Sequence, residues 1–298
     1  MAVTTDGFRD WLEALHARDR FGPRDRRGTA NLIDAAARAR GIASLTTGAP
    51  VSLARRLPPD PATTGGKAGL AVTVRLEELN PPVWMASDHV EIDCHGLHST
   101  HVDALNHMGR DRTWYGGWAV DDPDGPSVAD LAEAGLVTRA VLADIPAVRG
   151  TDWVDPDAPV TGDDIDAALA AAGVTFTPGD ALLLCMGRDR WEAAGNVYAS
   201  SVGDPPPPGA GLGAAEWIAD HGASIVGWDF LDSAHRSQPS GAVHMLIWAI
   251  GLVLVDNCDF AAARAALAAK GAPTGLLVVA PLRIPGATGA TVDPLLLV

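Results

Sequence analysis

The stretch HGLHSTHVDALNH, residues 95–107, decides how the rest of the chain is interpreted. It contains four of the nine histidines in the 298-residue sequence, together with one aspartate. Charged residues make up only 20% of the chain, so this concentration of titratable groups stands out from its surroundings. Such a group indicates a metal site or a proton relay, and the structural alternative is a buried network of hydrogen-bonded histidines.

The spacing inside this stretch favours a metal site. His101 and Asp103 are two residues apart, so they share a face if the segment is a strand. Asp103 and His107 are four apart, so they share a face on a helical turn. A strand that bends into a helix near Asp103 would aim all three side chains at one point. Imidazole nitrogen and carboxylate oxygen are donors that suit zinc or manganese.

A catalytic metal site needs further ligands, and the segment SGAVHMLIWAIGLVLVDNCDF, residues 240–260, offers two. His244 precedes an apolar helix-like run and Asp256 follows a short apolar strand-like run. A helix over residues 244–251 rises about 10 Å, and a strand over residues 252–256 returns about 13 Å. The two lengths nearly cancel, so His244 is expected to meet Asp256. The structural alternative is a helix-starting histidine and a surface aspartate.

Taken together, these two segments resemble the cyclase family of metal-dependent hydrolases, which includes bacterial kynurenine formamidase and isatin hydrolase. The family signature is HxGTHxDxPxH, followed far downstream by a histidine and, twelve residues later, a glutamate. The segment STHVDALNH carries the core of the signature, and His244 and Asp256 are twelve residues apart. The segments FGPRDRRGTANLI, VTRAVLADIPAVRG, PGDALLLCMGRDRW and GAGLGAAEWIADHGASIVGWD also resemble recurring family segments, so the likeness spans most of the chain.

The resemblance implies a role for each matching residue. His101 and Asp103 correspond to metal ligands, and Asp103 corresponds to a carboxylate able to bridge two metals. His244 corresponds to the downstream histidine ligand, and Asp256 stands where the family usually has glutamate. His107 corresponds to the last histidine of the signature, which donates and accepts protons.

The sequence departs from the signature at two ligand positions. The first histidine of the signature falls on Leu97, and the carboxylate at Asp256 is one carbon shorter than glutamate. His95 or His98 could replace the missing ligand if the strand carries a bulge. Whether the site holds one metal or two is left open by these departures.

The sequence also suggests residues that contact a substrate. His95, His98 and Trp84 are the candidates, since all three lie close to the signature in the chain. Nine tryptophans against two tyrosines suggest a pocket for a flat aromatic or heterocyclic molecule. The alternative is that the tryptophans fill the core or anchor an interface.

The remaining sequence predicts one mixed α/β (α+β) domain over residues 31–298, preceded by a helix and arm over residues 1–30. Strands are expected at residues 49–57, 70–79, 89–97, 139–145 and 180–187, and helices at 31–41, 127–135, 161–173, 214–222, 242–251 and 259–271. Gly41 is the expected C-cap of the first of these helices. Residues 58–69 and 201–213 are rich in proline and glycine and predict loops. The resemblance implies a swivelling β/β/α fold.

The resemblance implies a metal-dependent hydrolase of a small amide, lactam or ester, with zinc or manganese, a metal-bound water as nucleophile and His107 as proton shuttle. Two other functions remain open. One is a cyclase or dehydratase of secondary metabolism on the same metal site. The other is a catalytically silent ligand-binding protein with a degenerate site.

Charge and cysteine content limit the partners and the compartment. A net charge of −15 argues against nucleic acid or an anionic membrane as the main partner. We therefore expect a small-molecule substrate, and the resemblance implies a homodimer or homotetramer. The cysteines Cys94, Cys185 and Cys258 are odd in number and lack CxxC spacing, which favours a reducing cytoplasm over a disulfide framework. No signal peptide or membrane-spanning run is recognisable.

Overall fold

The computed structural model describes residues 5–57, 70–198, 200 and 206–298. The strands there are β1 (Pro50–Ser52), β2 (Leu70–Asn80), β3 (Val83–Ile92), β4 (His101–Asp103), β5 (Leu136–Asp144), β6 (Ala181–Cys185), β7 (Ile225–Trp228), β8 (Val253–Asp256), β9 (Thr274–Val279), β10 (Gly289–Thr291) and β11 (Leu295–Leu297). The helices are α1 (Thr5–His16), η1 (Gly28–Leu32), α2 (Ala35–Ala43), η3 (Tyr115–Gly117), α3 (Val128–Ala132), α4 (Ile145–Arg149), α5 (Gly162–Ala171), α6 (Arg188–Ala193), α7 (Leu212–His221), α8 (Met245–Ile250) and α9 (Ala261–Lys270).

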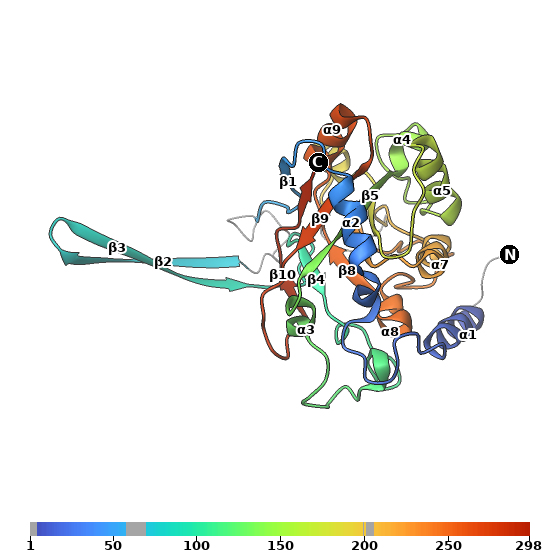
Figure 1. The fold of residues 1–298 in the computed structure, drawn as a ribbon, viewed down its shortest axis with the longest axis horizontal. Coiled ribbons are helices and arrows are strands. Elements are labelled where there is room, and N and C mark those ends of the chain that lie inside the picture. Colours follow the sequence, from blue (N-terminus) through green and yellow to red (C-terminus); the bar gives the residue numbers. More distant parts are fainter. Residues whose placement is uncertain (1–4, 58–69, 199, 201–205) are drawn as a thin grey trace.

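A mixed sheet forms the centre of the molecule. Its strand order is β1-β11-β9-β5-β6-β7-β8-β4-β10. The strands β5 to β8 run parallel to one another, and the other pairs are antiparallel. A second sheet, made of β2 and β3 alone, extends away from the body (Figure 1). The expected mixed α+β fold is confirmed.

The parallel strands are covered on both faces, which explains their continuous apolar sequences. In β6, Leu182 and Leu184 pack into one buried cluster with side chains of α1, α5, α7 and α8. Leu183 and Cys185 join a second buried cluster with side chains of α3 and α9. This is the two-residue alternation of a strand that is buried on both sides. The strands predicted at residues 139–145 and 180–187 are therefore confirmed.

Gly41 lies inside α2 and is not its C-cap, so this prediction is wrong. The helix runs on to Ala43, and Ser44 is the C-cap residue. A Cβ on Gly41 would come within 2.5 Å of Leu276 Cδ1 and 2.9 Å of the Arg139 backbone nitrogen. Glycine at this position allows α2 to pack closely on the sheet.

Other predicted elements differ in extent. The strand expected at residues 49–57 is only three residues long, and the one expected at residues 89–97 ends at Ile92. The helix predicted at residues 242–251 begins at Met245. The loop predicted at residues 58–69, and residues 201–205 of the second loop, lie outside the described residues. No helix within the described ranges is long and apolar enough to cross a membrane.

The helix expected in the N-terminal arm is α1, and it packs against α8. Phe8, Leu12 and Leu15 are buried in the same cluster as the side chains of α8. The His16 ring stacks on Trp248 with 4.0 Å between ring centroids, and His16 Nδ1 lies 3.0 Å from the Trp248 carbonyl oxygen. The N-terminal arm thus supports the helix that begins next to His244.

Two glycines bring η1 into close contact with the end of α8. Gly28 has φ +52° and Gly251 has φ +69°, both in the left-handed region. The Thr29 backbone N–H donates to the Gly251 carbonyl at 2.8 Å. A Cβ on Gly28 would lie 2.0 Å from the Gly251 carbonyl oxygen. This contact fixes the turn by which α8 passes into β8.

We expect Gly28→Ala to lower the free energy of unfolding by at least about 3 kcal/mol, from left-handed strain and overpacking against backbone together. Gly48→Ala is the matched control, because Gly48 has φ +68° and no atom within 4 Å of an added Cβ. The control should lose only about 1 kcal/mol. Urea unfolding measures both, and equal losses would contradict the assigned clash.

Candidate metal centre

The pairing of β4 with β8 brings three polar side chains together in the sheet. His101 lies directly opposite Asp256 in the antiparallel register, and Asp103 shares the face of His101. His101 Nε2 lies 3.5 Å from Asp103 Oδ1 and 3.8 Å from Asp256 Oδ2. All three residues are buried. His101 Nδ1 donates to the Ser99 carbonyl oxygen at 2.8 Å, which orients the ring so that Nε2 faces the carboxylates.

His244 reaches the same point from the start of α8. The helix ends at Gly251 and the chain turns back into β8, so the start of α8 lies beside the end of that strand. His244 Nε2 is 3.3 Å from Asp256 Oδ2 and 3.9 Å from Asp103 Oδ2. The similar lengths of the helix and the strand between His244 and Asp256 therefore bring the two residues together, as the sequence predicts.

His95 and His107 complete the cluster from the turns before and after β4. His95 Nδ1 lies 3.1 Å from Asp103 Oδ1, and His107 Nε2 lies 3.9 Å from Asp103 Oδ2. The two rings stack with 4.3 Å between centroids. After Asp103 the chain forms a turn in which the His107 N–H donates to the Ala104 carbonyl. The helix expected at this point is absent from the structure of residues 104–107.

The turn that carries His95 also depends on a glycine opposite β4. Gly289 on β10 pairs with Asp103. A Cβ on Gly289 would come within 2.7 Å of His95 Cε1 and 2.6 Å of the Val102 carbonyl oxygen. The absence of a side chain there makes room for the His95 ring, whose Nε2 lies 2.9 Å from Thr288 Oγ1.

The hydrogen-bonding state of Asp103 shows that a cation fits this cluster. Both carboxylate oxygens are buried, and no described residue donates a hydrogen bond to either of them. His95 Nδ1 is likewise buried, and its 3.1 Å contact with Asp103 Oδ1 is an ion-pair contact that does not meet hydrogen-bond geometry. Two groups in the described residues could each hold a metal ion, and they share Asp103: His95, Asp103 and His107, and His101, Asp103 and Asp256. Orphaned donor atoms that converge on one point are what a divalent cation requires.

The electric field at the cluster also favours a cation. Burial opposes a charge on His244, but the charges of Asp256 and Asp232 outweigh it and raise the pKa of His244 well above its usual range. Burial alone would raise the pKa of Asp256, yet the His244 charge lowers it well below the usual range. Carboxylates that hold a proton on an imidazole so firmly attract a metal ion by the same field.

The two turn histidines respond differently to burial. For His95, the nearby Asp103 carboxylate outweighs burial and raises the pKa. For His107, burial dominates and lowers the pKa below 6.5. Burial therefore favours the neutral form of His107. Cys94, which precedes His95, has its pKa raised to about 12 by burial and by the charge of Asp103, so it is no nucleophile.

The structure separates His98 and Trp84 from this cluster. His98 faces Arg188 and Arg55, and burial together with these charges lowers its pKa. Trp84 is the second residue of β3, next to the turn between β2 and β3, and is 62% exposed. That end of the hairpin points away from the body that contains β4 (Figure 1). Leu97 packs against the larger buried cluster. Of the candidates to replace the ligand missing at Leu97, the structure brings His95 to Asp103.

Sequence reasoning missed the residue that orients His244. Asp232 accepts from His244 Nδ1 through one carboxylate oxygen and from the Val243 N–H, at 2.6 Å, through the other. A carboxylate bound to the second ring nitrogen fixes the tautomer and direction of a histidine ligand. The sequence did contain a sign of this role. Asp232 comes four residues after the buried strand β7, at the carboxyl end of the strands, where the neighbouring parallel strands also place polar groups.

A second set of missed residues holds the turn that carries His95. Arg188 is fully buried and donates to the Leu97 carbonyl at 2.9 Å and to Asn257 Oδ1 at 2.8 Å. Asn257 Nδ2 donates to the carbonyls of Gly96 and Ser99. Arg188 is thus committed to the protein interior. Trp228, also buried, donates to Asp256 Oδ1 at 2.5 Å.

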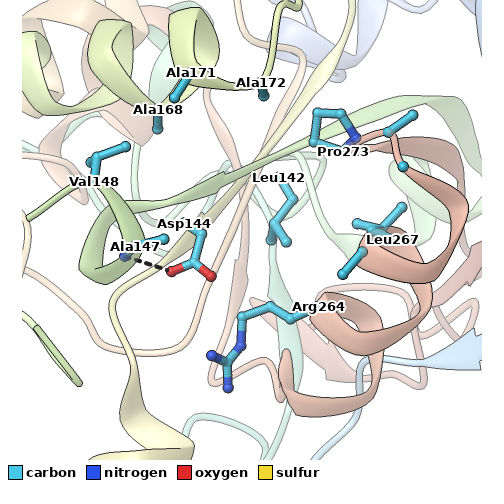
Figure 2. A pocket seen from close by; sticks show the side chains of 13 residues that line it. Leu142, Asp144, Ala147, Val148, Ala168, Ala171, Ala172, Arg264, Leu267 and Pro273 are labelled. Carbon is cyan, nitrogen blue, oxygen red and sulfur yellow. Dashed lines mark hydrogen bonds between the residues drawn. The ribbon is translucent and has the colours of Figure 1, made fainter. Parts of the chain in front are cut away.

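Two cavities differ in their relation to the cluster. A cavity of about 180 Å³ adjoins it, lined by Met108, Leu231, Asp232, Ser233, Ala234, Ser240, Gly241 and His244. A larger one, about 390 Å³, lies between β5, α4, α5 and α9 and is lined mainly by alanine and leucine, with Asp144 and Arg264 at one side (Figure 2). It contains no histidine, and β5 is three strands away from β8 in the sheet. The candidate chemistry therefore belongs to the smaller cavity.

Solved structures with similar folds exist. A crystal structure of a novel cyclase superposes with a TM-score of 0.81 at 23% identity, covering 96% of this chain and 99% of that chain. An isatin hydrolase bound to the product analogue thioisatinate gives a TM-score of 0.60 at 21% identity, covering 84% and 92%. Isatin hydrolase A from Ralstonia solanacearum gives 0.58 at 22% identity, covering 87% and 95%. At these identities the likeness establishes the fold alone.

Comparison with curated protein sequences found no match. The Cyclase family model, in contrast, matches residues 70–235, which is more than half of the chain. The matched region begins with β2 and includes β4 and Asp232. Together with the shared fold, this match shows that the protein belongs to the cyclase family.

Proposed function

We propose that this chain is a metal-dependent hydrolase that cleaves a small amide, lactam or ester. The observation that carries the proposal is the Asp103 carboxylate, which is buried without a hydrogen bond from any described residue. Imidazole nitrogens of His95, His101, His107 and His244 lie within 3.9 Å of its oxygens. Membership of the cyclase family and the fold shared with isatin hydrolases support the reaction class.

The ligand set suits zinc or manganese. His101, Asp103, His244 and Asp256 are the proposed ligands, and His95 stands where it can replace the ligand missing at Leu97. When bound, such an ion supplies the positive charge that polarises a carbonyl oxygen and makes a water more acidic. Imidazole and carboxylate donors accommodate either ion.

His107 is the proposed proton shuttle. Its burial lowers its pKa, so a neutral nitrogen is available near pH 7 to accept a proton from water. The same nitrogen can return the proton to the leaving nitrogen or oxygen. The adjoining cavity of about 180 Å³ would admit only a small substrate within a single chain.

The first test is the metal content of protein purified without a histidine tag or chelator. We expect about one equivalent of zinc or manganese per chain, or two if both groups around Asp103 are filled. Asp103→Asn should lose the metal, because it removes the carboxylate common to both groups. His89→Asn is the control, since His89 is exposed on β3. Metal retained by Asp103→Asn, or absent from the reconstituted native protein, would contradict the proposal.

The second test separates proton transfer from metal binding. His107→Gln should keep its metal and lower kcat by about 10²–10⁴-fold on a panel of N-formyl aromatics and cyclic amides. In the native enzyme, kcat/KM should fall on the acid side with a midpoint below pH 6.5, because the neutral form of His107 is required and its pKa is lowered. Loss of metal in this variant would make His107 a ligand instead. A product with one water less than its substrate would indicate a cyclase or dehydratase.

The third test concerns Asp232. Asp232→Asn should weaken metal affinity by about 10–100-fold, because His244 loses the carboxylate that fixes its tautomer. Asp157→Asn is the control, since Asp157 is exposed and lies 3.9 Å from His235, away from the cluster. Competition with a chromogenic chelator measures both affinities. Equal affinities in the two variants would show that Asp232 does not orient a ligand.

A further inference from the structure

The larger cavity, between β5, α4, α5 and α9, takes no part in the proposed hydrolase reaction. Its volume of about 390 Å³ is within the range of small-molecule pockets. It lies at the carboxyl end of β5, where α5 covers one face of the sheet and α9 covers the other. Crevices of this kind are where α/β sheets bind ligands. Three strand spacings of ~4.8 Å place β5 roughly 14 Å across the sheet from β8, so the cavity is separate from the metal centre.

The inner wall of the cavity is apolar. Leu142 of β5 and Ala168 of α5 are each 6% exposed, and Leu267 of α9 is 3% exposed. Much of the remaining wall is alanine, which leaves space that larger side chains would fill. No aromatic ring lines the cavity among the described residues. A wall of this kind suits an aliphatic group, because burial there removes apolar surface from water.

One acidic and one basic side chain line the polar side of the cavity without pairing (Figure 2). Asp144 accepts one hydrogen bond from the described residues, from the Ala147 N–H to Oδ1 at 3.2 Å. Arg264 donates only through Nη2, to Asp189, and its Nε is buried without an acceptor. Within the described part of the chain, Asp144 and Arg264 form no ion pair with each other. Both therefore keep hydrogen-bonding capacity for a ligand.

Helix α6 supplies the partners of these two side chains. Asp189 pairs with Arg264, and the next residue, Arg190, places Nη2 3.7 Å from Asp144 Oδ1. Each side chain is thus drawn toward its own partner on α6. Asp189 Oδ1 and Arg190 Nη2 are themselves buried without a hydrogen bond to any described residue. Buried polar atoms normally have partners, so this side of the cavity lacks a group that both donates and accepts.

We propose that this cavity binds a small α-amino acid with an aliphatic side chain. In such a molecule one carbon carries both the ammonium and the carboxylate group. The ammonium can donate to Asp144 while the carboxylate accepts from Arg264, and both are charge-assisted hydrogen bonds, which are the stronger kind. The side chain leaves the same carbon and enters the alanine-lined part of the cavity. A ligand with a single charge would leave either Asp144 or Arg264 without a partner.

Calorimetric titration of the full chain with L-leucine tests this proposal. L-leucine should bind with a dissociation constant below ~1 mM. Isocaproate lacks the ammonium group and isoamylamine lacks the carboxylate, so each should bind at least about 10-fold more weakly. Titration at two temperatures ensures that a small binding enthalpy is not mistaken for an absence of binding.

Substitutions in the cavity identify which end of the ligand each side chain binds. Asp144→Asn keeps an oxygen that can cap α4, but should abolish the preference for L-leucine over isocaproate. Arg264→Gln should abolish the preference for L-leucine over isoamylamine. Ala171→Leu fills part of the cavity and should weaken binding at least about 10-fold. Ala170→Leu is the matched control, since Ala170 is also exposed on α5 but does not line the cavity, and it should bind as the native protein does.

Asp103→Asn separates this site from the metal centre, because amino acids can also chelate a metal ion. The variant should bind L-leucine as tightly as the native protein, so the result is independent of the hydrolase proposal. Circular dichroism verifies that each variant is folded. The proposal would be overturned by a native protein that binds no L-leucine at about 10 mM, by equally tight binding of isocaproate or isoamylamine, or by loss of binding in folded Asp103→Asn.

Discussion

Antiparallel pairing of β4 with β8 places the three central groups of the candidate metal centre. The register sets His101 opposite Asp256, and strand alternation turns Asp103 to the same side. Backbone hydrogen bonds thus position three donor residues before any side-chain contact is considered. His95 and His107 then need only short turns before and after β4 to reach the same point. A site built on strands is held more accurately than one built on loops, and coordination of a metal requires that accuracy.

A ring of buried polar contacts reinforces this placement. Asp232 accepts a hydrogen bond from Nδ1 of His244 and so orients its ring, and Trp228 donates a hydrogen bond to Asp256. Arg188 has its pKa lowered to about 10, first by burial and then by Arg55, yet in the interior it donates to the Leu97 carbonyl of the turn that carries His95. A buried guanidinium is costly unless its donors are paired. Its presence here shows how much of the surrounding structure serves to hold one loop.

Some of this was predictable from sequence and some was not. The spacing of His101 and Asp103 reflects a local period of two, and the separation of His244 and Asp256 reflects simple helix and strand lengths. Both depend on neighbouring residues alone. The approach of His95 to Asp103 depends instead on the turn at residues 93–100, on Arg188 and on Gly289, which are far apart in the chain. Gly41 was misread for a similar reason: a glycine that ends a helix and one that admits a neighbouring strand look alike in sequence. The sequence predicted β2 and the end of β3 as strands, but it did not predict their pairing with each other or their isolation from the main sheet.

The unbonded carboxylate of Asp103 has a consequence for how the protein folds. Burying a carboxylate with no hydrogen-bond donor carries a desolvation cost that the imidazoles around it offset only in part. A cation that binds the folded chain and not the unfolded one adds stability by mass action, about 2.7 kcal/mol when its concentration is 100 times its dissociation constant. Folding and cation uptake are then one coupled equilibrium. A cation held at Asp103 would therefore make the stability of the folded chain depend on the concentration of free cation.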